Sequence, residues 1–202
     1  MPTGEWLIAA GEVGGTHEGG SHIYRQGPGP KLPLYLNGQC MARAGEREVI
    51  LAGGEGFSRA FREAFIMDWE TKEWEPLPPM TYTHTYHACF VLGNNFYVVG
   101  GKGDDVFSES SEKLSLVDRI WSPGPKLPPG YSGEGPLWNP EVVYYRDTVL
   151  LIGGWERDGP SHSPRILELD LAENEFVVRP ERLRVGTKLH TAVVLPDDDV
   201  PC

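Results

Sequence analysis

Short apolar runs, each closed by glycine, recur along the chain at nearly regular intervals. Three of them end in a glycine doublet, and a fourth ends in a single glycine. The runs are of strand length and show no helical period, so each one predicts a β-strand. Their last glycines stand 43, 47 and 53 residues apart, which predicts four repeats that account for the whole chain. In order, the runs are WLIAAG at 6–11, VILAGG at 49–54, FYVVGG at 96–101 and VLLIGG at 149–154.

The residues around each run predict three further strands per repeat. An apolar strand precedes the doublet strand through a short turn, as in HACFVLGNNFYVVGG at 87–101. Gly93-Asn94-Asn95 suits a tight hairpin there, because these residues tolerate a positive φ. A polar loop follows the doublet and leads to a third and a fourth strand. Four short strands in succession predict one antiparallel meander per repeat.

The turn between the third and fourth strands carries an acidic residue. AFIMDWETKEW at 64–74 and LELDLAENEF at 167–176 place an aspartate six residues before an aromatic residue. LSLVDRIW at 114–121 places Asp118 only three residues before Trp121. The spacing predicts a shortened turn in the third repeat.

A single meander cannot cover both of its faces, and packing several around a common axis buries them in a β-propeller. The glycine doublets then lie where the backbones of neighbouring blades crowd together, and large aromatics fill the space between blades. The stretch PGPKLP, at 28–33 and again at 123–128, becomes a connector between blades. The predicted blades are blade 1 at 5–33 plus 187–196, blade 2 at 38–79, blade 3 at 85–129 and blade 4 at 140–183.

The two ends of the chain predict how the ring closes. No first strand precedes WLIAAG, whereas LHTAVVL at 189–195 aligns with YHACFVL at 86–92 and places His190 on His87. We therefore expect the C-terminal strand to pair into the N-terminal blade and to close a four-bladed ring. Two alternatives stay open: the chain is a fragment or splice form of a longer ring, or two chains form a homodimer with eight blades.

The glycine doublet, the later acidic residue and the aromatic residue after it resemble the kelch repeat. The resemblance covers essentially the whole chain in four copies, and the first copy departs from it. There Ala10-Gly11 replaces the doublet and Gln26 stands in the place of the tryptophan. The resemblance to animal kelch proteins implies an all-β propeller of four-stranded antiparallel blades. It also implies an interaction platform, since only a few kelch families are enzymes.

Composition and charge narrow the class of protein. The chain of 202 residues is 40% apolar, and its net charge of −11 argues against nucleic-acid binding, which needs a basic face. No apolar window approaches the length of a membrane span, and the N-terminus lacks the features of a secretory signal. We expect a cytoplasmic protein, or a secreted one if a signal has been removed.

Cysteines and histidines predict no metal, cofactor or catalytic centre. Cys40, Cys89 and Cys202 show no zinc spacing, and we expect two buried thiols and one terminal thiol. Cys40 and Cys89 are interpreted as equivalent first-strand positions. His84 and His87 stand three apart, so on a strand they would face opposite sides and would not share an ion.

Function is expected on the loops that follow the doublets and on the exits between blades, because variable loops on a rigid scaffold are common binding sites. The leading hypothesis is a non-enzymatic scaffold that binds a protein or an acidic peptide there. Alternatives are a sugar-like ligand or catalysis in the central channel, or a fragment of a ubiquitin-ligase adaptor. The candidate contact residues are Trp155, Arg157, Asp158, His162, Arg59, Arg62, Asp104, Asp105, Tyr82 and His84, with Phe57, Phe107 and Tyr131 as further candidates.

Overall fold

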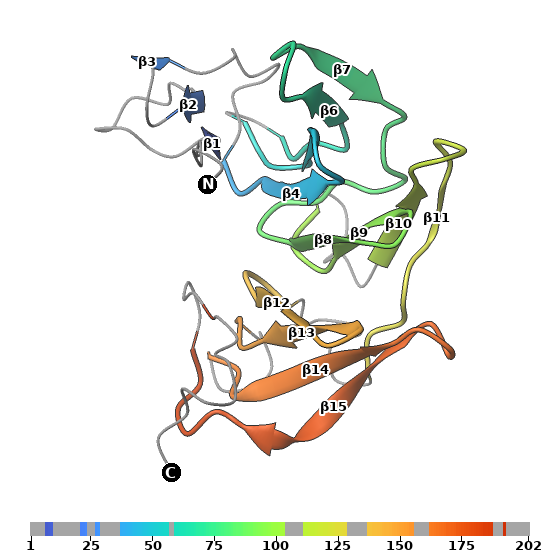
Figure 1. Cartoon of the computed structure of the whole chain (residues 1–202). Coiled ribbons are helices and arrows are strands. Elements are labelled where there is room, and N and C mark those ends of the chain that lie inside the picture. The colour runs from blue at the N-terminus through green and yellow to red at the C-terminus, as the bar shows by residue number, and fades with distance from the viewer. Residues whose placement is uncertain are drawn as a thin grey trace, which may run out of the picture.

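All regular structure in the described residues of the computed structural model is β-sheet (Figure 1). The structure describes residues 7–9, 21–23, 27–28, 37–56, 59–103, 111–128, 137–155, 162–187 and 192. The predicted all-β class in antiparallel sheets is confirmed, with four sheets in the orders β1-β2-β3, β4-β5-β6-β7, β11-β10-β9-β8 and β12-β13-β14-β15. The first sheet contains β1 (Leu7–Ala9), β2 (Ser21–Ile23) and β3 (Gly27–Pro28).

The other three sheets have four strands each, paired in chain order. The first contains β4 (Cys40–Ala44), β5 (Glu48–Ala52), β6 (Ala64–Asp68) and β7 (Trp74–Leu77). The second contains β8 (Ala88–Leu92), β9 (Asn95–Val99), β10 (Ser111–Ser115) and β11 (Trp121–Pro123). The third contains β12 (Glu141–Tyr145), β13 (Thr148–Ile152), β14 (Arg165–Asp170) and β15 (Glu175–Arg182).

The three four-stranded sheets follow one another in an arc, with β1–β3 at the opposite end of the arc from β12–β15 (Figure 1). Their first strands form the inner side, because β4 lies against β8 and β8 lies against β12. We call these sheets blades 2, 3 and 4. Each first strand is the apolar strand that precedes a glycine doublet in the sequence.

Two separate apolar cores fill the spaces between the blades. The first joins blade 2 to blade 3 and includes Ile50, Ile66, Phe96 and Leu114. The second joins blade 3 to blade 4 and includes Phe90, Leu151, Leu167 and Phe176. Because side chains alternate across a strand, blade 3 sends one set of residues into each core. The blades are therefore held face to face by burial of apolar area.

The glycine doublets lie at these contacts, and their two members have different neighbours. A Cβ on Gly53 would lie 2.4 Å from His84 O at the entry of the next blade. A Cβ on Gly101 would lie 2.5 Å from Thr85 O at the entry of its own blade. Both glycines have a positive φ, 63° and 87°. Only glycine meets both demands, which is why the doublet recurs.

The turn in the third repeat corrects one prediction. It has the same length as the other two, because Ser115 ends β10 where Asp68 ends β6 and Asp170 ends β14. The hydroxyl of Ser115 donates to Asp118 Oδ2 at 3.0 Å, so the carboxylate comes from within the turn. The sequence predicted a shorter turn because no aspartate stands at position 115. In the structure, Ser115 and Asp118 together take the role of that aspartate.

The cysteines correct a second prediction. Cys40 and Cys89 form a disulfide between β4 and β8, with Cα atoms 5.9 Å apart, and are not free thiols. They are not equivalent positions either, since Cys40 pairs with Ala52 and Cys89 pairs with Val98, one residue further from the doublet. That offset of one turns the two side chains to opposite faces of their sheets, so they meet between the blades. Cys202 lies outside the described residues.

Ring closure is not decided by the described residues. The sheet β1-β2-β3 has three strands there, and of the segment 187–196 only Thr187 and Ala192 are described. The number of blades and the closing strand therefore remain predictions. Within the described part of the chain, no helix is long and apolar enough to cross a membrane.

Candidate functional site

The residues that follow the doublets meet the residues that enter the first strands. Antiparallel bridges join Asn37 to Glu55 in blade 2, Thr85 to Lys102 in blade 3 and Trp138 to Trp155 in blade 4. These three pairs occupy the same place in successive blades. They mark one end of the sheets, which we call the loop face. The opposite end carries the hairpin turns within each blade and is called the turn face.

A run of backbone hydrogen bonds links the blades across the loop face. Asn139 N donates to Tyr86 O at 2.8 Å, and Tyr86 N donates to Gly38 O at 2.7 Å. Gly38, Tyr86 and Asn139 are equivalent residues with φ of 65°, 55° and 47°. A positive φ is uncommon for a bulky residue, so its recurrence indicates a position that the packing of the blades imposes.

Tyr86 adds side-chain bonds at the junction of blades 2 and 3. Its hydroxyl donates to Glu55 Oε1 at 2.9 Å and accepts from Asn37 Nδ2 at 3.2 Å. The ring lies over Gly38, where a Cβ would be 3.0 Å from its carbons. The loop face is therefore a rigid surface at this junction, even though its residues belong to loops.

Blade 4 carries an aromatic pair at the equivalent place. The indoles of Trp138 and Trp155 stack with centroids 4.5 Å apart and an interplanar angle of 28°. Both side chains are half-buried, so part of the pair remains accessible. Blades 2 and 3 present polar pairs at the corresponding positions. The loop face is therefore chemically different at blade 4, and partly exposed tryptophan is typical of binding surfaces.

His84 is not available to a partner, which corrects its prediction as a contact residue. Its side chain is fully buried between blades 2 and 3. Nδ1 donates to Gly100 O at 2.8 Å, and Nε2 lies 3.2 Å from Glu112 Oε1. The entry segment turns inward here because the glycine doublet behind it leaves room for the backbone.

Glu112 is a buried carboxylate in a position that is apolar in the other blades. By strand register it corresponds to Phe65 in blade 2 and Leu167 in blade 4. It accepts hydrogen bonds from Thr81 N at 2.8 Å and Tyr82 N at 2.9 Å, as well as facing His84. Burial raises the pKa of Glu112, but the hydrogen bonds outweigh burial and the pKa lies below the ordinary 4.5. Glu112 thus fixes the exit from blade 2, which carries Tyr82.

His87 lies next to this cluster, at the start of β8. Its ring centroid is 5.6 Å from that of His84, so the two rings lie close together instead of on opposite sides. The expected alternation fails because Tyr86, between them, has a positive φ and breaks the extended geometry. Neither ring nitrogen of His87 has a hydrogen-bond partner of ordinary geometry. Burial, reinforced by His84, holds the pKa of His87 well below 6.5.

This burial predicts a pH dependence of stability. His87 stays neutral in the folded chain but takes up a proton in the unfolded chain below pH 6.5. The free energy of unfolding should therefore fall as the pH drops below 6.5, by at most about 1.4 kcal/mol per pH unit from this group. His87→Gln should flatten that part of the profile. Denaturant unfolding at pH 7.5, 6.5 and 5.5 measures it, and an equal slope in the variant would refute the assignment.

The remaining predicted contact residues are described in part. Tyr82 is exposed at 56% on the exit from blade 2. Arg62 is exposed and Arg59 pairs with Glu63 at 3.0 Å, while His162 is half-buried. The other candidates, Asp104, Asp105, Arg157, Asp158, Phe57, Phe107 and Tyr131, lie outside the described residues.

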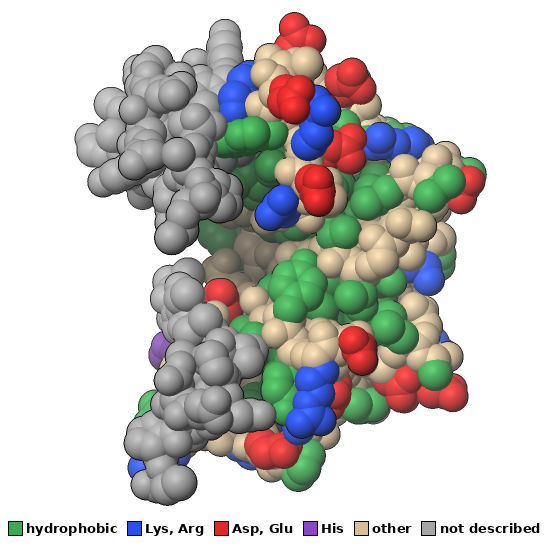
Figure 2. Space-filling model, in the orientation of Figure 1, with side chains coloured by type: hydrophobic (Ala, Val, Ile, Leu, Met, Phe, Trp, Pro, Cys, Tyr) green, Lys and Arg blue, Asp and Glu red, His purple; other side chains and the backbone are tan. Residues whose placement is uncertain are grey.

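A hollow of about 400 Å³ lies along the inner side of the blades. Figure 2 shows the molecule recessed where β4, β8 and β12 meet. We call it the axial hollow. Its lining includes the disulfide, Arg43, His87, Glu141 and Tyr144. The Tyr144 hydroxyl is engaged with the backbone of Val91, to which it donates at 3.0 Å and from which it accepts at 3.1 Å.

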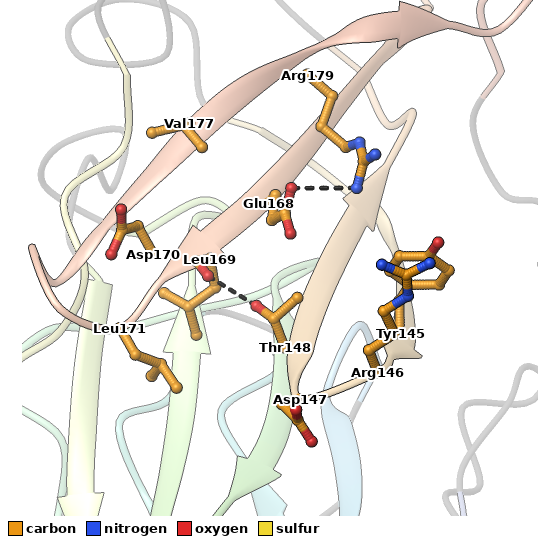
Figure 3. A pocket seen from close by; sticks show the side chains of 10 residues that line it. All are labelled: Tyr145, Arg146, Asp147, Thr148, Glu168, Leu169, Asp170, Leu171, Val177 and Arg179. Atoms are coloured by element: carbon orange, nitrogen blue, oxygen red, sulfur yellow. Dashed lines mark hydrogen bonds and ion pairs between the residues drawn. The ribbon is translucent and has the colours of Figure 1, made fainter.

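A second hollow, of about 600 Å³, lies toward the turn face of blade 4 (Figure 3). Its charged groups are largely bonded to one another or to the backbone. Arg179 Nη1 donates to Glu168 Oε2 at 3.1 Å, and Asp170 accepts from the backbone of its own turn. Arg146 lies over the ring of Tyr145, 5.1 Å from its centroid. This arrangement stabilises the end of the sheet and presents no convergent set of groups to a ligand.

Among the described residues, no group of three histidine, cysteine, aspartate or glutamate side chains is placed to hold a metal ion. Three residues of the loop face escaped the sequence analysis: Tyr86, Glu112 and Trp138. Glu112 carried a signal, because it is a charged residue in the alternation that Leu114 and Leu116 continue. Trp138 carried one as well, because it stands at the repeat position of Thr85, just before a first strand.

Comparison with known proteins finds partial similarity to three kelch proteins. The chain is 29% identical over 84 residues to Kelch-like protein 33 of Homo sapiens, 40% of this chain and 16% of that protein. It is 30% identical over 93 residues to Kelch-like protein 21 of Danio rerio, 45% of this chain and 14% of that protein. It is 26% identical over 110 residues to Kelch repeat and BTB domain-containing protein 2 of Cowpox virus (strain GRI-90 / Grishak), 54% of this chain and 19% of that protein.

The matched part of the chain spans less than a fifth of the length of each of these relatives. No protein-family model matches the chain. The three relatives agree with the repeat identified from the glycine doublets and with the blades that the structure describes.

Proposed function

We propose that the chain, which is similar to kelch-repeat proteins over part of its length, is a non-enzymatic scaffold that binds a protein or peptide on its loop face. One observation carries the proposal: the half-buried stack of Trp138 and Trp155 stands on the loop face, where blades 2 and 3 present polar pairs at the equivalent positions. Because the two stacked indoles already hold each other in place, little side-chain conformational entropy is lost when a partner binds to this aromatic step.

The charged residues of blades 2 and 3 on the loop face favour an acidic partner segment. Arg62 and Lys102 are exposed on the loop face, while Glu55 is already bonded to Tyr86 and Glu63 to Arg59. Among the described residues of the loop face, the uncompensated groups are therefore cationic, against an overall charge of −11. Tyr82, exposed on the neighbouring exit, provides a second aromatic contact. The proposed setting is the cytoplasm.

Substitution of the aromatic step tests the binding proposal. The test uses a partner protein captured with the unsubstituted chain. Trp155→Ala should weaken binding of that partner at least tenfold, because partly buried tryptophans dominate interface energies. Trp69→Ala removes another half-buried tryptophan, whose ring packs under Lys72 Nζ at 3.2 Å on the turn face, and should leave affinity unchanged. Affinities are measured by titration of purified proteins, with melting temperatures to confirm folding. A loss of affinity for Trp69→Ala but not for Trp155→Ala would place the binding site on the turn face and contradict the proposal.

We also propose that residues 187–196 close the ring by pairing with β1. Gly154 N donates to Thr187 O at 2.8 Å, as Gly54 N donates to His84 O and Gly101 N donates to Leu137 O. Thr187 therefore holds the place of an entry residue next to blade 4. In this proposal the segment after Thr187 supplies the first strand of blade 1 and pairs with β1.

Removal of residues 188–202 tests the closure. If they supply the missing strand of blade 1, the shortened chain should melt at least about 5 °C lower and lose protease resistance in residues 1–33, since a terminal blade would lack an edge strand. Mass measurement of the full chain separates the alternatives, because closure within one chain predicts a monomer. An unchanged melting curve, or a dimer of full-length chains, would contradict closure within one chain.

A further inference from the structure

We propose that the Cys40–Cys89 disulfide is a site of thiol–disulfide exchange that small thiols reach through the axial hollow. The two cysteines come from neighbouring inner strands, and their Cα atoms are 5.9 Å apart, within the range that a disulfide bridges without backbone movement. Both cysteines line the hollow together with β12 residues. The bond therefore lies beside the axial hollow.

The pairing depends on an offset of one residue between the positions of the two cysteines in their strand registers. Cys40 pairs with Ala52, and the residue at that register in blade 3 is Ala88. Cys89 corresponds in turn to Val142 of blade 4, which pairs with Leu151. Only blades 2 and 3 therefore place sulfur atoms toward each other. The disulfide forms a covalent link between two blades that otherwise meet through apolar contacts and hydrogen bonds.

Partial exposure makes the bond accessible in the folded chain. Cys89 retains 9% of its surface and Cys40 is half-buried. The hollow, at about 400 Å³, is large enough for a thiol of the size of a small peptide. Two charged side chains line it, Arg43 and Glu141, and the Arg43 guanidinium is occupied by the carbonyls of Gly45 and Glu46. The guanidinium keeps its positive charge, so an incoming thiolate meets one cationic and one anionic side chain, and Glu141 is the one that repels it.

Exchange proceeds in two steps that conserve atoms and electrons. An external thiolate attacks one sulfur, the Cys40–Cys89 bond breaks, and the released cysteine leaves as a thiolate that takes a proton from water. A second external thiol attacks the mixed disulfide and releases the other cysteine. Two thiols are oxidised to one disulfide, and the protein disulfide is reduced by two electrons. A reducing compartment would therefore open the link, and an oxidising one would keep it closed.

Opening the link should loosen the contact between blades 2 and 3 without unfolding them. The disulfide joins residues 49 apart in sequence, so it restricts a long segment of the unfolded chain. Both apolar cores remain when it opens. We expect the reduced chain to melt roughly 5 to 15 °C below the oxidised chain while still folded at 25 °C.

The test uses the full chain, purified without reductant and exposed to glutathione. Cysteines are blocked with an alkylating reagent at timed intervals and quantified by mass spectrometry. The expected rate of reduction rises in proportion to glutathione over a tenfold range, because the site is open in the folded protein. A rate that levels off would mean that reduction awaits unfolding, and free thiols at positions 40 and 89 before reduction would mean that the bond does not form. Either result overturns the proposal.

Charge in the hollow gives a site-specific check. Glu141→Gln should speed reduction by glutathione, an anionic thiol, about threefold, because it removes a like charge near the reacting sulfur atoms. The variant should change the rate of reduction by 2-mercaptoethanol by a smaller factor, because that thiolate carries no charge besides the one on sulfur. Glu73→Gln makes the same charge change on the turn face and should change neither rate. Equal effects of the two variants would place the reaction outside the hollow.

Discussion

A chain carrying Gly101→Ala is expected to lose about 3 to 5 kcal/mol of unfolding free energy. The glycine has a φ of 87°, where an L-residue is strained by about 1–3 kcal/mol. Its new Cβ would also lie 2.5 Å from Thr85 O and 2.8 Å from His87 Cβ. Neither neighbour can retreat, because both belong to the bonded entry of blade 3, and such overpacking costs a further 1–3 kcal/mol or so.

Gly93→Ala is the matched control for this prediction. Gly93 also has a positive φ, 59°, but nothing lies within 4 Å of the position of a Cβ. The Gly93→Ala chain should lose only the unfolding free energy that comes from backbone strain, about 1 kcal/mol. Urea unfolding of the three proteins measures the difference. Equal losses would mean that the doublet is retained for its conformation alone and that the blades do not crowd there.

Replacing Glu112 with leucine is expected to destabilise the chain by about 3 to 5 kcal/mol, although leucine is the residue that blade 4 has at this register. The substitution leaves Thr81 N and Tyr82 N, the donors of two part-buried hydrogen bonds, without their acceptor, and each lost bond costs about 1–2 kcal/mol. It also removes the partner of His84. Because the exit that carries Tyr82 depends on these bonds, the loop face should lose order at blade 2.

The acid dependence of stability checks the same assignment. The pKa of Glu112 lies below 4.5 in the folded chain, so its stabilisation is complete above pH 4.5 and is lost as the pH falls through the lower folded value. Glu112→Leu should remove that dependence. Glu181→Gln, which removes an exposed partner of Arg179, should cost much less than Glu112→Leu. A small loss for Glu112→Leu would show that the exit does not depend on the carboxylate.

Gly101 and Glu112 also show which parts of the structure could be predicted from the sequence and which could not. The glycine doublets and the strand runs predicted the sheets, because a repeat shows the same constraint several times over. Glu112 could not be assigned, because its acceptor role depends on backbone donors 30 and 31 residues away. The disulfide was missed for a related reason, since alignment of the apolar runs hides an offset of one residue in strand pairing. Such an offset decides which face a side chain occupies.

The position of the loop face was predicted from the sequence, but only some of the residues that form it were. Loop position follows from the order of strands, and so Trp155 and Tyr82 were identified as candidates. Whether a residue on such a loop turns outward or inward depends on local backbone geometry. Tyr86, with a positive φ, directs the chain so that His84 and His87 both lie in the interior. No pattern of apolar and polar residues carries that information.

The central claim is that one bonding pattern joins each blade to the next and continues past blade 4. Hydrogen exchange of three equivalent amides tests it most directly. Gly54 N, Gly101 N and Gly154 N donate to His84 O, Leu137 O and Thr187 O at 2.7, 3.0 and 2.8 Å. All three amides should exchange slowly, and each should be far more protected than the exposed turn amide of Gly45. Protection of Gly54 and Gly101 together with rapid exchange of Gly154 would contradict the claim and would end the bonded array at blade 4.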